Sequence, residues 1–171
     1  MTGPSLTLVL GGARSGKSAF AQARAEATRG ACVYLATARA GDAEMAARIA
    51  AHRRQRGPRW RTVEEPLALA AALRREAGAD RIVLVDCLTL WLSNLLAAGA
   101  DMAVERDGLV AACGELPGPV ILVSNEVGQG IVPDNALARR FIDEAGWLHQ
   151  QLARVAGEVF FLTAGLPQRL K

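Results

Sequence analysis

A glycine-rich segment near the start of the chain constrains the fold more than any other feature. Residues 11–18 read GGARSGKS and match G-x-x-x-x-G-K-[ST] at every defined position. An apolar run at 6–10 precedes the segment and a helical pattern follows, so a chance glycine-rich turn is a poor alternative. In such a loop the backbone N–H groups cradle phosphates, the lysine reaches the β- and γ-phosphates, and the hydroxyl binds Mg²⁺. Phosphate contacts are therefore predicted at Gly11, Gly12, Ala13, Arg14, Ser15, Gly16, Lys17 and Ser18, with Lys17 catalytic and Ser18 a magnesium ligand.

Apolar runs alternate with helical patterns along the rest of the chain, which predicts an α/β fold. The runs at 6–10, 32–36, 81–86, 120–124 and 158–163 lack polar alternation, as in strands covered on both faces. Helices are predicted at about 17–28, 42–55, 66–77, 89–98 and 135–155. We expect a mostly parallel, doubly wound, three-layer sheet in one domain spanning residues 1–171.

Composition excludes several classes of protein. No apolar run approaches the roughly 20 residues that a membrane helix needs, and no signal segment is seen, so no membrane association is expected. The net charge of +3 permits anionic ligands but gives no argument for nucleic acid. Cys32, Cys87 and Cys113 are widely spaced in apolar surroundings. They are predicted to be buried free thiols of a cytoplasmic protein.

The apolar run at 81–86 ends in Asp86. Enzymes with a phosphate loop hold Mg²⁺ with an aspartate of this kind on a neighbouring strand. Ligands of an open α/β sheet also bind at the carboxyl ends of its strands. A magnesium ligand is favoured for Asp86, and a cap for the helix beginning near Thr89 is the alternative.

His52 falls on one helical stripe with Met45 and Ile49, which by itself favours a packed core histidine. Arginines crowd its surroundings, at positions 53, 54, 56, 59 and 61. They suit a polyphosphate ligand, although such a run is more often a solvated face. Flanking cations also disfavour imidazolium, which would leave a neutral, nucleophilic ring. His149 lies among Trp147, Leu148 and Leu152 and is interpreted as structural.

Further segments carry a resemblance to a known family: Tyr34-Leu35-Ala36-Thr37, 42–49 followed by His52-Arg53, Trp60-Arg61-Thr62 with Glu64, Asp86-Cys87-Leu88-Thr89, Ser93-Asn94-Leu95-Leu96, and 124–133. Together with the phosphate loop, and in this order, they resemble the bifunctional adenosylcobinamide kinase/adenosylcobinamide-phosphate guanylyltransferases of cobalamin biosynthesis. The similarity runs almost end to end. Some relatives have His-His where this chain has Ala51-His52, so one candidate nucleophile remains here.

The resemblance implies a RecA-like P-loop fold and a homotrimer that uses GTP, ATP and Mg²⁺. A nucleoside triphosphate would phosphorylate adenosylcobinamide, and GTP would then donate GMP to adenosylcobinamide phosphate through a GMP-histidine, which falls on His52. Besides residues 11–18, the resemblance places GTP contacts at Ala36, Thr37, Ala38, Arg53, Arg54, Gln55, Arg56, Glu64 and Asp86.

Two other functions fit the phosphate loop alone. A monofunctional kinase of a small metabolite, or a nucleotide-driven regulatory switch, would need Lys17 and Ser18 but not His52. The proton acceptor of the kinase step is also open. Glu126 is a candidate, and the equally weighted alternative is that Glu126 and Asn125 brace the following loop.

Overall fold

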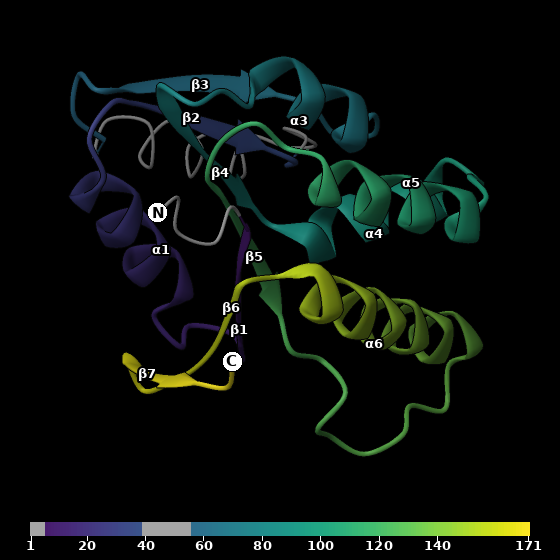
Figure 1. Cartoon of the computed structure of the whole chain (residues 1–171). Helices are drawn as coiled ribbons and strands as arrows, with labels where there is room; N and C mark the ends of the chain where they lie inside the picture. The colour runs from purple at the N-terminus through teal and green to yellow at the C-terminus, as the bar shows by residue number, and fades with distance from the viewer. Residues whose placement is uncertain (1–5, 39–55) are drawn as a thin grey trace.

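The computed structural model describes residues 6–38 and 56–171, and in them one seven-stranded sheet forms the centre of the fold (Figure 1). Its order is β3-β2-β4-β5-β1-β6-β7. The strands are β1 Leu6–Gly11, β2 Ala31–Ala36, β3 Trp60–Glu64, β4 Arg81–Asp86, β5 Val120–Asn125, β6 Glu158–Thr163 and β7 Leu166–Arg169. All neighbouring pairs are parallel except β6 and β7, which form an antiparallel hairpin. The predicted mostly parallel α/β sheet is confirmed.

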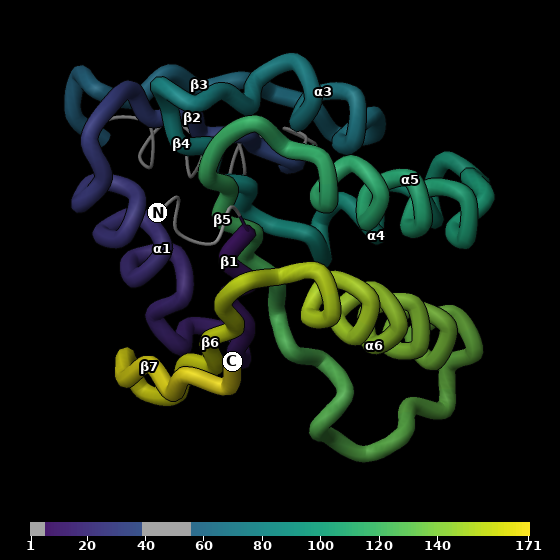
Figure 2. The backbone as a smooth tube through the Cα atoms, viewed as in Figure 1, coloured from purple at the N-terminus to yellow at the C-terminus, as the bar shows by residue number. Residues whose placement is uncertain are grey.

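Helices cover both faces of the sheet, as the continuous apolar strands predicted. The helices are α1 Lys17–Ala27, α3 Leu69–Glu76, α4 Leu88–Ala97, α5 Met102–Gly114 and α6 Ala136–Val155. Helix α1 packs on the face that carries Val9, Ile82 and Val123. The other four pack on the opposite face, where Leu8 and Val85 lie in a second apolar cluster. Figures 1 and 2 show α1 on one side of the sheet and α4, α5 and α6 on the other. This is the expected three-layer arrangement.

The five predicted strands match observed strands to within one residue, but the expected number was wrong because β3 and β7 were missed. Both are edge strands, and an edge strand has one hydrogen-bonded neighbour. Strand β3 reads WRTVE, with charged and partly exposed side chains, and β7 reads LPQR and is exposed throughout. Neither therefore shows the apolar run by which buried strands are recognised.

Helix α5 was also missed, because its sequence MAVERDGLVAACG contains an internal glycine and has no clear apolar stripe. Helices α1, α4 and α6 lie where they were predicted, to within a residue at each end. Helix α3 begins three residues later than the predicted 66–77. The predicted helix at 42–55 lies outside the described residues.

Two expectations from composition can be compared with the structure. Cys32, Cys87 and Cys113 are free and buried, as predicted. Within 6–38 and 56–171, no helix is both long enough and apolar enough to cross a bilayer.

A prediction follows from the start of α5. The Asp101 carboxylate accepts hydrogen bonds from the N–H groups of Ala103 at 3.0 Å and Val104 at 3.2 Å. Asp101→Ala should cost about 1 kcal/mol of unfolding free energy, because these amides lose their cap. Thermal unfolding should shift down by roughly 2–4 °C. An unchanged melting temperature would show that the cap contributes nothing.

Candidate functional site

The carboxyl ends of the parallel strands gather the predicted polar residues at one edge of the sheet. In the strand registers Ala36 pairs with both Glu64 and Asp86, and Asp86 pairs with Val123. Gly11, at the end of β1, pairs with Asn125. Residues far apart in the sequence therefore lie near one another at the carboxyl ends of the strands. An open α/β sheet binds its ligand at this end.

The phosphate loop leaves this edge between β1 and α1, in the context that the motif requires. Gly16 caps α1 with a left-handed backbone, φ 93°, and Arg14 also has a positive φ of 55°. A Cβ on Gly16 would lie 3.0 Å from the Cα of Gly165. Glycine is thus required at position 16 for two reasons: the left-handed φ angle disfavours a side chain, and Gly165 leaves no room for one.

Lys17 is buried, with 6% of its surface exposed. Its ammonium group donates to the Gly12 carbonyl at 2.5 Å and to the Ser15 hydroxyl at 3.4 Å, inside the loop itself. Burial lowers the pKa of Lys17, while the nearby Asp86 carboxylate opposes that shift. A desolvated cation held by a few dipoles is well suited to bind phosphate oxygens.

The β6–β7 hairpin supports the loop from the far side of β1. Its turn residues Ala164 and Gly165 have positive φ angles of 51° and 81°. The N–H of Gly165 donates to the Ser15 carbonyl at 2.9 Å. This contact was missed from sequence, and the only signal for it was the Ala-Gly pair after an apolar run.

Asp86 ends β4, as predicted, but β4 is not the neighbour of β1, because β5 lies between them. The expected neighbouring strand was therefore wrong. Asp86 still lies close enough for its charge to act on Lys17. The alternative role as a helix cap is also wrong, because α4 begins after Cys87 and has no side-chain cap bond.

The donor set at this edge suits a magnesium ion shared with phosphate. The Ser18 hydroxyl is exposed at the start of α1 and the Asp86 carboxylate is half-buried. Both offer oxygen, which Mg²⁺ prefers, and Mg²⁺ commonly takes one or two protein ligands plus waters and substrate phosphates. No cluster of three or more His, Cys, Asp or Glu side chains able to hold a metal occurs in the described residues. An all-protein metal cage is thus absent from that part of the chain.

Tyr34 connects Arg56 to Asp86. The Arg56 guanidinium lies over the Tyr34 ring, 3.2 Å from its centroid, and donates to the Thr62 hydroxyl at 3.3 Å. Burial and the adjacent Asp86 carboxylate raise the pKa of Tyr34, so its hydroxyl stays protonated. Arg56 is thus brought to the same edge as Asp86. Sequence analysis assigned Tyr34 no role beyond its place in a motif.

The predicted contact positions 36–38 lie at the end of β2. Thr37 is fully buried, and its hydroxyl donates to the Cys87 carbonyl at 2.7 Å and accepts from the Cys87 N–H at 3.1 Å. The Thr37 side chain is therefore not available to a ligand, and its carbonyl already accepts a hydrogen bond from Asn94 at 2.8 Å. Ala36 is buried, Ala38 is partly exposed and Glu64 is exposed on β3.

The end of β5 adds polar groups beside the loop. The Asn125 amide donates to the Thr89 hydroxyl at 2.9 Å, and the Glu126 N–H donates to the Gly11 carbonyl at 2.9 Å. The Glu126 carboxylate accepts from the Gly128 N–H, so both side chains brace their surroundings. A role for Glu126 as a proton acceptor stays a prediction.

His149 is buried and forms a hydrogen bond of 2.7 Å with the Ser124 hydroxyl, in keeping with its structural interpretation. Burial lowers its pKa, opposed by the Glu126 charge. The other histidine, His52, lies outside the described residues together with the predicted contacts Arg53, Arg54 and Gln55.

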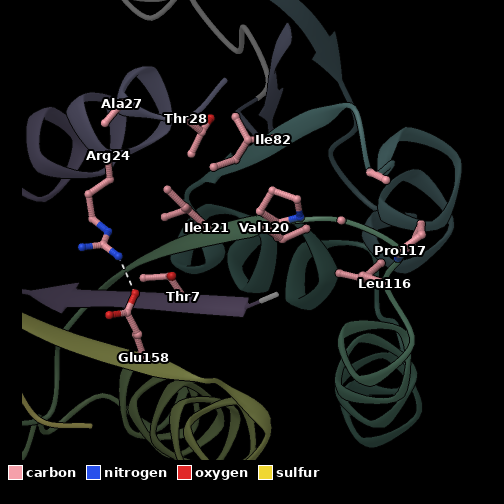
Figure 3. Close-up of a pocket in the computed structure, with 13 residues that line it drawn as sticks. Thr7, Arg24, Ala27, Thr28, Ile82, Leu116, Pro117, Val120, Ile121 and Glu158 are labelled. Atoms are coloured by element: carbon pink, nitrogen blue, oxygen red, sulfur yellow. Dashed lines mark hydrogen bonds and ion pairs between the residues drawn. The ribbon is translucent and has the colours of Figure 1, made fainter. Parts of the chain in front are cut away.

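A hollow of about 750 Å³ opens at the opposite edge of the sheet (Figure 3). Its walls include Thr7, Ile82 and Glu158, from the amino ends of strands, and an ion pair joins Glu158 to Arg24 of α1. None of the predicted site residues within 6–38 and 56–171 lines it. The hollow is therefore not the candidate site, despite its size.

Comparison with known proteins gives one family. Residues 7–170 match the family described as cobinamide kinase / cobinamide phosphate guanyltransferase. The chain is 57% identical to the bifunctional adenosylcobalamin biosynthesis protein CobP of Pseudomonas aeruginosa over 166 residues, covering 96% of each. It is 40% identical to the bifunctional adenosylcobalamin biosynthesis protein CobU of Escherichia coli, covering 97% of this chain and 99% of that protein.

A solved structure shares the fold. The chain resembles the P4 protein of bacteriophage phi6, determined in complex with ADP, with a TM-score of 0.51 and 15% identity. The match covers 96% of this chain and 53% of the viral one. At that identity the likeness concerns fold alone, and it agrees with the P-loop sheet predicted from the motif.

A substitution in the loop tests its geometry. Gly16→Ala should lower the affinity for nucleoside triphosphate about tenfold or more, because a Cβ is strained at this φ and meets Gly165. Isothermal titration with GTP would measure the affinity. Gly12→Ala is the structural control, since a Cβ there meets nothing within 4 Å, and its melting temperature should match that of wild type. Wild-type affinity in Gly16→Ala would contradict the assigned loop.

Proposed function

Because this chain belongs to the cobinamide kinase / cobinamide phosphate guanyltransferase family, we propose that it performs both reactions at one nucleotide site built on residues 11–18. The observation that carries this proposal is the position of Lys17 and Asp86 at one edge of the sheet, within electrostatic reach of each other. A monofunctional kinase or a regulatory switch would need the phosphate loop but does not account for a match to the bifunctional family from end to end.

In the kinase step, the phosphates of ATP or GTP occupy the loop and adenosylcobinamide supplies a hydroxyl. The N–H groups at the start of α1 and the Lys17 ammonium face the phosphates. The hydroxyl oxygen attacks the γ-phosphorus, and its proton passes to a base, for which Glu126 is the candidate. The bond between the γ-phosphorus and the β–γ bridging oxygen breaks, and the nucleoside diphosphate leaves. Lys17 stabilises the charge that develops on the transferred group.

In the guanylyl transfer, His52 is the nucleophile. A neutral imidazole nitrogen attacks the α-phosphorus of GTP, a P–N bond forms, and pyrophosphate leaves. A phosphate oxygen of adenosylcobinamide phosphate then attacks the same phosphorus, and the P–N bond breaks to release His52 and adenosylcobinamide-GDP. A covalent intermediate divides a difficult transfer between two anions into two easier steps.

Three arginines that follow His52 in the sequence assist the guanylyl transfer in this proposal. Arg53, Arg54 and Arg56 neutralise the triphosphate, and they disfavour a protonated His52. Support for the position of Arg56 comes from its contact with Tyr34, beside Asp86. Gln55, Glu64 and the backbone of residues 36–38 complete the proposed contacts with the nucleotide.

Ser18 and Asp86 hold the magnesium ion in this proposal. When bound, Mg²⁺ neutralises phosphate charge and orients the triphosphate for in-line displacement. Ser18 contributes its hydroxyl from the first turn of α1, and Asp86 contributes a carboxylate from the end of β4.

The chain works in the cytoplasm as a homotrimer in this proposal, without nucleic-acid or membrane partners. Apolar side chains exposed between β5 and α6 support self-association: Ile131 is 97% exposed and Val132 is 74% exposed. Exposed apolar groups that lie close together commonly mark protein contacts. Sedimentation of the purified protein would test the trimer.

Asp86→Asn should weaken the metal dependence of both reactions and leave stability almost unchanged. The amide keeps the size of the carboxylate but loses the charge that binds Mg²⁺. The half-saturating Mg²⁺ concentration should rise about tenfold or more, measured in both assays. Normal metal dependence together with a large fall in melting temperature would instead indicate a structural role.

His52→Asn should separate the two chemistries, and Lys17→Ala should remove both. His52→Asn should abolish acid-labile labelling by α-³²P-GTP and lower guanylyl transfer by several orders of magnitude, while kinase activity falls far less. Lys17→Ala should abolish both activities with the fold intact by circular dichroism. If His52→Asn still carries labelled GMP, or if both its activities fall equally, His52 is not the nucleophile. Survival of either activity in Lys17→Ala would argue against one shared site.

A further inference from the structure

We propose that Asn94 is a positioning residue of the nucleotide site, which holds the ends of β2 and β3 at fixed distances from α4. This inference rests on the proposed function, because it assigns its effect to the nucleotide contacts at 36–38 and Glu64.

The Asn94 side chain bridges two separate connections. Its carboxamide nitrogen donates to the Thr37 carbonyl at 2.8 Å and to the Pro66 carbonyl at 3.0 Å. Thr37 directly follows β2, and Pro66 comes two residues after the end of β3. One planar amide on α4 thus satisfies two backbone acceptors from segments 29 positions apart in the chain.

Those two carbonyls flank proposed contacts. Thr37 lies between Ala36 and Ala38, and in the sheet Ala36 pairs with both Glu64 and Asp86. The chain between β2 and β3, which includes His52, leaves the sheet at Thr37. The bond to Thr37 therefore fixes the start of this connection, and the bond to Pro66 fixes the β3–α3 connection beside Glu64.

The Thr37 hydroxyl extends the bridge to the metal ligand. It bonds both the carbonyl and the N–H of Cys87, the residue after Asp86. A displacement of Thr37 would leave these two buried groups without their partner. Asn94 is thereby linked through Thr37 to the backbone beside Asp86.

Only asparagine fits this position among side chains of its size. The two acceptors require two N–H donors from one nitrogen, which a carboxamide provides. Aspartate has the same shape but offers only acceptors, so it would place a negative charge against two carbonyl oxygens. Leucine fills similar space without any donor. We therefore expect Asn94→Asp to do more damage than Asn94→Leu.

The phosphate loop does not depend on this bridge. Lys17 bonds within its own loop, and the loop is supported by Gly165 of the β6–β7 hairpin. Loss of the Asn94 bonds should therefore weaken contacts with the nucleoside and its α-phosphate while contacts with the polyphosphate survive. Damage to the whole fold would weaken both.

The experiment measures three quantities in the full chain. They are the dissociation constant of GTP with Mg²⁺, the inhibition constant of inorganic tripolyphosphate against GTP binding without Mg²⁺, so that Asp86 does not enter that comparison, and the single-turnover rate of labelling by α-³²P-GTP. In Asn94→Asp the GTP dissociation constant should rise and the labelling rate should fall, each about tenfold, as expected for the loss of one or two hydrogen bonds. The inhibition constant of tripolyphosphate should stay within about twofold of wild type. Asn94→Leu should shift in the same direction by less.

Asp101→Ala is the matched control, because it lowers stability at the start of α5, away from the site residues, and should leave all three quantities unchanged. If Asn94→Asp does not fold, Asn94→Leu carries the test, since its helix already has buried leucines at 92 and 95. GTP binding and labelling within about twofold of wild type would overturn the proposal, as would a parallel loss of tripolyphosphate affinity. The labelling of His52→Asn decides the proposed function separately, because retained label there refutes the nucleophile whatever Asn94 does.

Discussion

The parallel pairing of β1, β5 and β4 is the constraint on which the site depends. Parallel strands present their carboxyl ends at one edge, so the loop after β1 and the aspartate at the end of β4 face the same space. Strand β5 separates them by one strand, yet the Asp86 charge still acts on Lys17. The apolar clusters on both faces hold this pairing, and a slip in register would displace every contact at the edge.

At the carboxyl ends of the strands, neighbouring groups reduce the free-energy cost of a buried charge and of a left-handed backbone. Lys17 is buried, and its pKa is lowered by burial, but the Gly12 carbonyl accepts its hydrogen bond and Asp86 favours its charged form. Gly16 keeps a left-handed conformation that a side chain would strain. Such pre-organisation suits a site that must stabilise developing charge on phosphorus without rearranging first.

The interactions behind the edge join its parts into one unit. Side-chain hydrogen bonds of Thr37, Asn94 and Asn125 connect the segments at the ends of β2, β3 and β5 to α4 and to Cys87, which precedes it. The β6–β7 hairpin supports the phosphate loop independently. The two supports therefore come from different parts of the fold.

The sequence by itself determined the elements whose chemistry is local. Sequence patterns predicted the phosphate loop, the buried strands and the position of Asp86 at a strand end. They did so because glycine spacing and continuous apolar runs have direct physical causes. The resemblance to the family depended on further segments as well, among them 42–49 with His52 and 124–133. His52 stays a prediction because it lies outside the described residues. Only the tertiary structure decided that β5 separates Asp86 from the loop, that edge strands β3 and β7 complete the sheet, and that Asn94 bridges two connections. Those facts depend on which segments meet in space, and a strand order or a hydrogen bond between distant residues leaves no periodic trace along the chain.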